Sequence, residues 1–163
     1  MKNRILLLLV AVTFLMMQTC LAAAPWKEIP KEDIAIGGVN LGATRDYVES
    51  VYGKPDSVEH KDLNCGEIIH LEINRYGTSF FVTYDLDTTR VVEVKSTGNN
   101  GLKVPAGFAV GDNISDVRKY YNGAGFSRKK NEQHYTADWY LNLHFEADSK
   151  GKIKEIIASE NLV

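Results

Sequence analysis

A repeated sequence pattern constrains this chain's fold more than any other feature. The segment Gly38–Pro55 (GVNLGATRDYVESVYGKP) recurs in ungapped register 69 positions further along the chain. Identical residues are Gly38 with Gly107, Gly42 with Gly111, Val48 with Val117, and Tyr52 with Tyr121. Conservative matches are Val39 with Phe108, Leu41 with Val110, and Thr44 with Asn113. Since internal repeats indicate repeated structural units, we expect two related units.

Each copy of the repeat predicts a short helix. In the first copy, Thr44 is a suitable N-cap, because its hydroxyl can accept a hydrogen bond from a first-turn amide. Val48, Val51 and Tyr52 have the spacing of one apolar stripe, and Gly53 can end the helix. The second copy offers an equivalent set: Asn113 as the cap, with Val117, Tyr120 and Tyr121 as the stripe.

Segments with alternating polarity follow each predicted helix and indicate antiparallel strands with one buried face. These segments are 67–73, 79–85 and 91–96 in the first half, and 133–137, 139–146 and 153–159 in the second. In the first segment, Ile69, Leu71 and Ile73 share one face, while Ile68, His70 and Glu72 share the other. In the second, Phe80, Val82 and Tyr84 alternate with Ser79, Phe81 and Thr83. In 139–146, Trp139, Leu141, Leu143 and Phe145 are expected to point inward, and Tyr140, Asn142 and His144 outward.

The predicted fold class is therefore α+β. It consists of two tandem repeats, each a short helix or helical hairpin packed on an antiparallel β-meander. The expected organisation is a signal peptide at 1–22, an extended leader at 23–33, repeat unit 1 at 34–97, a linker at 98–102 and repeat unit 2 at 103–163.

The N-terminus has the pattern of an export signal. Lys2 and Arg4 precede an apolar run over 5–17, and Cys20-Leu21-Ala22 forms a small-x-small cleavage site. We predict cleavage after Ala22 and a periplasmic or secreted protein without a transmembrane segment in the mature chain. The alternative is a lipoprotein anchored at Cys20, although the residues before this cysteine depart from the usual lipoprotein signal.

Charge and cysteine content exclude some classes of protein. Loss of two positive charges with the signal peptide takes the formal net charge from −2 to −4. A nucleic-acid partner is not expected, because such binders normally carry a basic face. If the predicted cut is used, Cys65 is the one remaining cysteine, so internal disulfides cannot stabilise the fold. Its thiol is either spare or part of an intermolecular link.

The helix motif Gly42-Ala-Thr-x3-Val48-x3-Tyr52-Gly53-x-Pro55 resembles that of the SmpA/BamE family of small envelope domains. The strand ends Phe81–Asp85 and Val91–Val94 contribute to the resemblance. The two-copy layout is similar to that of tandem-repeat β-lactamase inhibitory proteins. The resemblance implies a helix-on-meander fold and a protein-binding role in the cell envelope. The second copy departs from the motif, with Asn113 in place of Thr and Asn122 in place of Gly.

Residues that would indicate catalysis are not arranged in a recognised motif. The sequence has no G-x-S-x-G elbow. His60, His70, His134 and His144 lack the spacing of zinc ligands, and Asp85, Asp87 and Asp148 fit hairpin turns. We therefore predict no catalytic, cofactor or metal site and no enzymatic activity. The competing hypothesis is a small-ligand carrier, or an uncharacterised enzyme, with a cleft between the two units.

A surface patch is the remaining candidate site. The predicted outward-facing residues are aromatic and polar, a composition common at protein interfaces. They are His70, Phe81, Tyr140, Asn142 and His144. We predict that they bind another protein of the envelope or periplasm.

Overall fold

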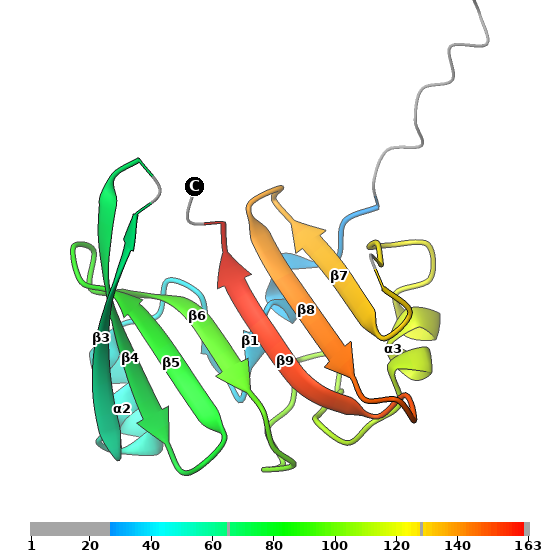
Figure 1. Ribbon diagram of the computed structural model, residues 1–163, viewed down its shortest axis with the longest axis horizontal. Coiled ribbons are helices and arrows are strands. Elements are labelled where there is room, and N and C mark those ends of the chain that lie inside the picture. The colour runs from blue at the N-terminus through cyan, green and yellow to red at the C-terminus, as the bar shows by residue number, and fades with distance from the viewer. Residues whose placement is uncertain (1–26, 65, 128, 162–163) are drawn as a thin grey trace, which may run out of the picture.

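The fold is dominated by one seven-stranded antiparallel sheet with strand order β3-β4-β5-β6-β9-β8-β7 (Figure 1). The computed structural model describes residues 27–64, 66–127 and 129–161. The predicted signal peptide, Cys20, Trp26 and Cys65 lie outside these ranges. The strands are β3 (Ser57–Asn64), β4 (Ile68–Tyr76), β5 (Phe80–Asp85), β6 (Arg90–Ser96), β7 (Glu132–Ala137), β8 (Leu141–Ala147) and β9 (Ile153–Glu160).

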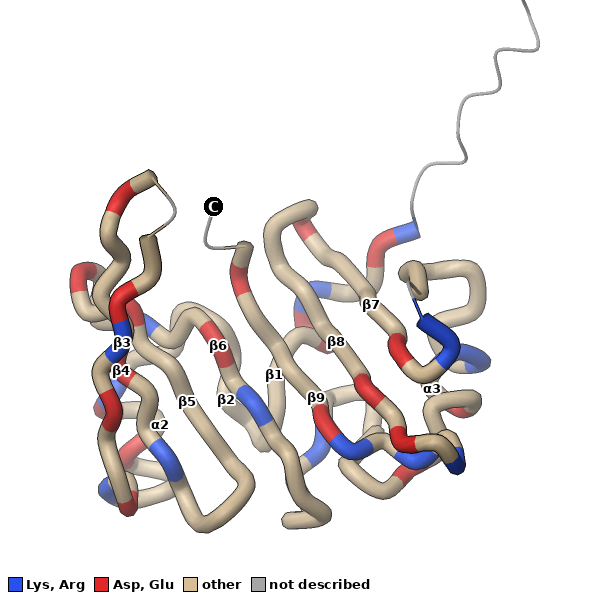
Figure 2. The backbone as a smooth tube through the Cα atoms, viewed as in Figure 1, with Lys and Arg blue, Asp and Glu red and all other residues tan. Residues whose placement is uncertain are grey.

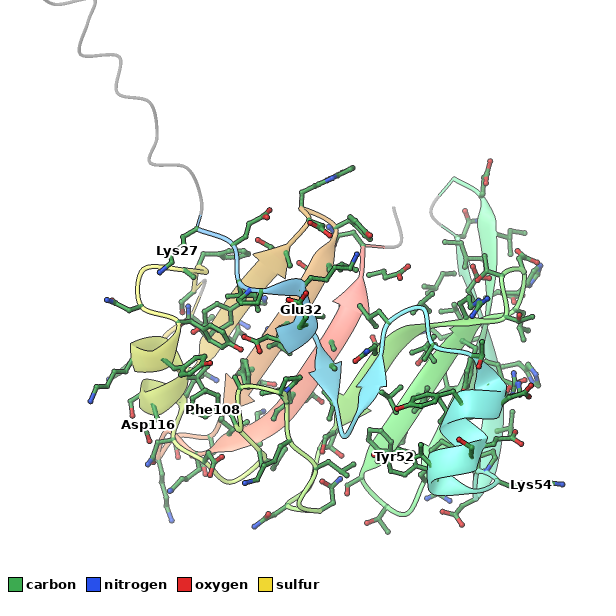
Figure 3. The ribbon with its side chains drawn as sticks, turned by 180° about the vertical axis from the view of Figure 1, so that it is seen from behind. Lys27, Glu32, Tyr52, Lys54, Phe108 and Asp116 are labelled. Carbon is green, nitrogen blue, oxygen red and sulfur yellow. The ribbon has the colours of Figure 1, made fainter. Side chains whose placement is uncertain are left out.

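All of the smaller elements lie on one side of this sheet (Figure 3). They are the 3-10 helix η1 (Lys31–Asp33), the hairpin β1 (Ala35–Ile36) and β2 (Val39–Asn40), and the helices α2 (Arg45–Tyr52) and α3 (Ile114–Tyr120). The sheet therefore has a covered face, beneath these elements, and an open face. No helix in the described part of the chain is long and apolar enough to span a membrane.

One hydrophobic core fills the space between the covered face and these elements. Alternation along the strands determines which side chains enter it: Phe80, Val82 and Tyr84 from β5, and Leu141, Leu143 and Phe145 from β8 are all buried. Val48 of α2 and Val117 of α3 belong to the same cluster. Because residues from both halves of the chain share this core, the two halves are packed as one body.

The two helices begin and end differently, although their sequences align. Thr44 accepts a hydrogen bond from the Tyr47 amide at 3.2 Å, so the predicted cap is confirmed. Asn113 occupies the N-cap of α3 but makes no capping bond. The stripe prediction is wrong for Val51, which is 52% exposed, and for Tyr120, which is 60% exposed. Helices of eight and seven residues have room for few buried side chains.

The predicted fold class, two tandem helix-on-meander repeats, is wrong. The molecule is β-rich, because its strands form one seven-stranded sheet and its two helices are short. Strand β6 of the first half pairs directly with β9 of the second, from Glu93–Ser159 to Ser96–Ile156. The first half contributes four strands to this sheet and the second half three. The Gly, Val and Tyr positions that the two copies share therefore reflect similar local turns and contacts. The residue boundaries given above for the two units, 34–97 and 103–163, stay a prediction.

Three strand predictions also need correction. Strand β3 was not predicted, because its sequence SVEHKDLN is almost entirely polar. In β4, the face with Ile69, Leu71 and Ile73 is open, whereas the covered face carries Glu72, Asn74 and Tyr76, as their pairing with Tyr84, Val82 and Phe80 shows. Trp139 does not point inward. It lies between β7 and β8 and is 81% exposed.

Candidate functional site

The strand register aligns one row of side chains across the open face. Successive cross-strand partners are Arg75, Phe81, Lys95, Ile157, His144 and His134, from β4, β5, β6, β9, β8 and β7. We call these six residues the central row. It joins a cationic and aromatic end to a paired-histidine end, and it crosses the junction between the two halves of the chain.

The first part of the open face contains side chains that are well buried. Leu71 and Thr83 are each only 5% exposed, although no helix lies above them. The Lys95 ammonium lies 5.1 Å from the centroid of the Phe81 ring, a cation–π contact that orders both side chains. This part of the face thus presents an aromatic ring beside well-packed aliphatic groups.

Glu93 is a carboxylate held at the centre of the open face. Burial raises its pKa, the nearby Lys95 charge opposes this rise, and Glu155 adds to it. Lys61 also lowers the pKa of Glu93, although β3 and β6 are three strands apart, about 14 Å in a flat sheet.

The other end of the face carries two histidines and a row of glutamates. His134 and His144 are directly opposite each other, with 3.0 Å between their Nδ1 atoms. Glu132, Glu146 and Glu155 are also cross-strand neighbours. Their acidic stripe is visible across β7, β8 and β9 in Figure 2.

Lysines at the edge partly neutralise this stripe. Lys129 pairs with Glu132 at 2.9 Å, and Lys154 pairs with Glu146 at 2.8 Å. Like charges directly opposite each other on neighbouring strands destabilise a sheet. Three aligned glutamates therefore do not stabilise the sheet. They are better placed to attract a basic group.

The structure brings together three of the five residues predicted for the patch. Phe81, Asn142 and His144 all lie on the open face, as their register with Lys95, Ser159 and Ile157 shows. His70 does not join them. It pairs with Asp62 near the free end of the β3–β4 hairpin, and its Nδ1 is 2.8 Å from the aspartate oxygen. Asp62 also raises the pKa of His70 through this contact.

Tyr140 is separate from the open-face patch as well. It lies in the connection between β7 and β8 and packs partly buried against the hydrophobic core. Its neighbour Trp139 is the more exposed aromatic side chain. Asp138 and Trp139 have φ angles of 47° and 54°, a backbone conformation that is strained for residues other than glycine.

Several contacts hold this strained connection in place. The Trp139 amide donates to Glu28 Oε1 at 3.2 Å, Lys31 pairs with Asp138 at 3.2 Å, and the Asn161 amide donates to the Tyr140 carbonyl at 2.8 Å. Trp139 was predicted to point inward because it continues the alternation of β8 in the sequence. The Asp-Trp pair after Ala137 was the available signal, since aspartate favours turns.

Two shallow hollows occur among the described residues, and neither contains the predicted patch. One, of about 300 Å³, lies between the N-terminal segment 27–33 and residues 120–124 after α3. The other, of about 250 Å³, lies beside η1 and β2. Both are on the covered side of the molecule, among the elements shown in Figure 3.

Comparison with known proteins does not identify a family for this chain. No family model matches the chain, and no curated protein matches it. One solved structure that resembles it is that of an extracellular protein containing a SCP domain from Bacillus anthracis str. Ames. The TM-score is 0.47 at 15% identity, and the match covers 74% of this chain but only 44% of that protein.

The fold shows that the resemblance to the SmpA/BamE family, and to the two-copy layout of β-lactamase inhibitory proteins, is wrong. The chain forms one seven-stranded antiparallel sheet with two short helices, instead of a helix-on-meander domain in tandem. The motif that suggested the family, around Gly42 and Gly53, marks positions with φ angles of 77° and 75°. Such glycines are needed at tight turns in many folds, so they do not identify a family.

Proposed function

We propose that this protein is an exported, non-enzymatic binding module that holds another protein against the open face of its sheet. The export signal at the N-terminus supports the location, either periplasmic or secreted. The single observation that carries the binding role is the central row, in which aromatic, cationic, aliphatic and imidazole side chains lie in register across six strands.

The chemistry of the face indicates what kind of partner it fits. Phe81 and Ile73 offer apolar contact area, and Glu93 and the three aligned glutamates offer negative charge. Buried carboxylates with shifted pKa values cluster at functional sites. The expected partner is thus a protein segment that presents apolar side chains together with lysine or arginine.

Site-specific photo-crosslinking tests this proposal most directly. A photoreactive residue is introduced in place of Ile157 on the open face, and in a second variant in place of Val51, which is exposed on α2. The proteins are expressed in the source cells, and crosslinked products are compared. A specific adduct from position 157 alone supports the proposal, whereas an adduct from position 51 alone places the interface on the covered side.

Substitution of the face then tests the partner's chemistry. Phe81→Ala combined with Glu93→Gln removes the ring and the central charge, and Tyr47→Ala combined with Val51→Ala is the control on α2. The first pair should reduce binding of the crosslinked partner at least tenfold, because truncating a central aromatic anchor costs about 2 kcal/mol or more. The control pair should leave binding unchanged, and equal losses would contradict the assignment.

A further inference from the structure

We infer that His134 and His144 form a binding site for a divalent transition-metal ion, of the Ni²⁺ or Cu²⁺ type. The inference concerns the histidine end of the open face, whose two residues also belong to the central row, and its test measures metal binding alone, without the protein partner. No group of three or more His, Cys, Asp or Glu side chains in the described part of the chain could hold a metal ion. The site therefore consists of two imidazole ligands, and solvent completes the coordination.

The backbone places the two imidazoles together. The N–H and C=O groups of His134 both bond to Phe126, at 2.9 and 2.8 Å, and thus point away from β8. His134 and His144 consequently form a non-hydrogen-bonded pair, the arrangement that brings cross-strand side chains closest. Their ring centroids are 4.1 Å apart. Proximity thus follows from strand register as well as from the side-chain conformations.

The distance between the ligand atoms selects a class of metal. The two Nδ1 atoms are 3.0 Å apart and within hydrogen-bond distance, so without an ion one ring donates its Nδ1–H to the other. An ion that replaced this proton, with bonds of about 2.05 Å to both nitrogens, would subtend about 94° between them. Square-planar and octahedral complexes need adjacent ligands near 90°, whereas tetrahedral zinc sites need wider angles. Imidazole suits Zn, Cu and Ni alike, and tetragonal geometry favours Cu²⁺ or Ni²⁺.

Neighbouring groups support the two ligands. Phe126 stacks on the His134 ring with an interplanar angle of 9°. Glu132 Oε2 lies 3.7 Å from Nε2 of His134, the ring nitrogen that is not in contact with His144 Nδ1. This separation is an ion-pair distance rather than a hydrogen bond, and a carboxylate that closed onto this nitrogen would increase the basicity of a metal-bound imidazole.

The site has no short-range ligand motif in the sequence. The two histidines are ten positions apart, with a strand connection between them. Neither of them has a histidine neighbour at helical spacing. Only the pairing of β7 with β8 brings them into contact.

Isothermal titration calorimetry with Ni²⁺ tests the inference. The protein carries no histidine tag and has Cys65→Ser, so that the thiol cannot bind the ion. We expect one Ni²⁺ per chain. His134→Ala and His144→Ala should each weaken binding by more than roughly tenfold, and Glu132→Gln by roughly tenfold, the lower end for an outer-shell partner. His60→Ala and His70→Ala are the matched controls and should leave the affinity unchanged.

A second measurement guards against variants that fail to fold. In the NMR spectrum of the protein with both histidines intact, Ni²⁺ should broaden the imidazole signals of His134 and His144 before those of His60 and His70. Absence of binding in the millimolar range, or equal broadening of all four histidines, would overturn the inference. So would binding that survives both alanine substitutions in variants whose circular dichroism shows an intact fold.

Discussion

Glu93 has surroundings unlike those expected at an exposed strand position. It lies on the uncovered side of the sheet, yet burial among its neighbours raises the pKa of its carboxyl group. Lys95 and Lys61 compensate only in part. A carboxylate in this environment disfavours folding at neutral pH, which fits a role in binding better than a role in stability.

The raised pKa of Glu93 predicts the direction in which the stability of the protein changes with pH. Because the folded state binds the proton more tightly than the unfolded state, Glu93 destabilises the protein as pH rises through its raised pKa. Below the unfolded value of about 4.5 this penalty disappears. Glu93→Gln should therefore raise Tm at pH 7 and leave it unchanged near pH 4.

Thermal denaturation followed by circular dichroism at both pH values measures this effect. Glu59→Gln, an exposed change on β3 of the same face, is the control. A variant that is stabilised equally at both pH values would show that the effect arises from the amide's packing and not from titration.

Trp139 combines high exposure with a strained backbone. Its φ of 54° is costly for a residue with a Cβ atom, by about 1–2 kcal/mol. Its ring gains little from the core, since 81% of the residue is exposed. We expect Trp139→Gly to be more stable than Trp139→Ala by about 1 kcal/mol, because both lose the ring and only glycine loses the strain. Chemical denaturation of the two variants makes the comparison, and equal stabilities would mean that the turn relaxes without the ring.

At the level of the elements, the two helices differ in how their first turns are satisfied. Both have an N-cap residue in extended conformation, at Thr44 and Asn113. Only the Thr44 side chain accepts a backbone amide. Asn113 instead donates from its side-chain amide to Asp116 Oδ2 at 3.4 Å.

This difference predicts unequal effects of equivalent substitutions. Thr44→Ala should reduce the free energy of unfolding by about 1 kcal/mol, the usual effect of losing a cap. Asn113→Ala should change it by less than about half a kcal/mol, as an exposed change does. Urea denaturation of both variants provides the measurement, and equal losses would indicate that the Asn113 side chain caps its helix in solution.

On the scale of the whole molecule, the pairing of β6 with β9 determines how the chain unfolds. This pairing makes one sheet from both halves, and one core lies beneath it. Val94 lies at the junction and Leu143 in the second half, and both are fully buried. A single cooperative transition is expected, as in other small single domains.

Calorimetry of two core variants tests this expectation. Val94→Ala and Leu143→Ala should each move one common transition to lower temperature, with Leu143→Ala costing about 2–5 kcal/mol. The calorimetric and van't Hoff enthalpies should agree. Two resolved transitions, of which Leu143→Ala shifts only one, would instead show that the two halves of the chain unfold independently.

Local features of the sequence determined much of the strand content. Strict alternation located β5 and β8 and identified their buried faces through Phe80, Val82, Leu143 and Phe145. The Thr44 cap was also predictable, because a cap depends only on residues within one helical turn. The same alternation placed Phe81, Asn142 and His144 on the open face, because it assigns a side chain to a face without reference to distant strands.

Tertiary structure alone decided which strands pair and which face is covered. Strand β3 has no apolar alternation, so only its pairing with β4 makes it a strand. The covered face of β4 depends on where α2 lies, and the joining of β6 to β9 depends on pairs of residues that are 60 to 66 positions apart in the sequence. A repeated local motif fixes turns and single buried residues. It does not determine whether the two copies fold as separate units or share one sheet, since that depends on long-range pairing and on the common core.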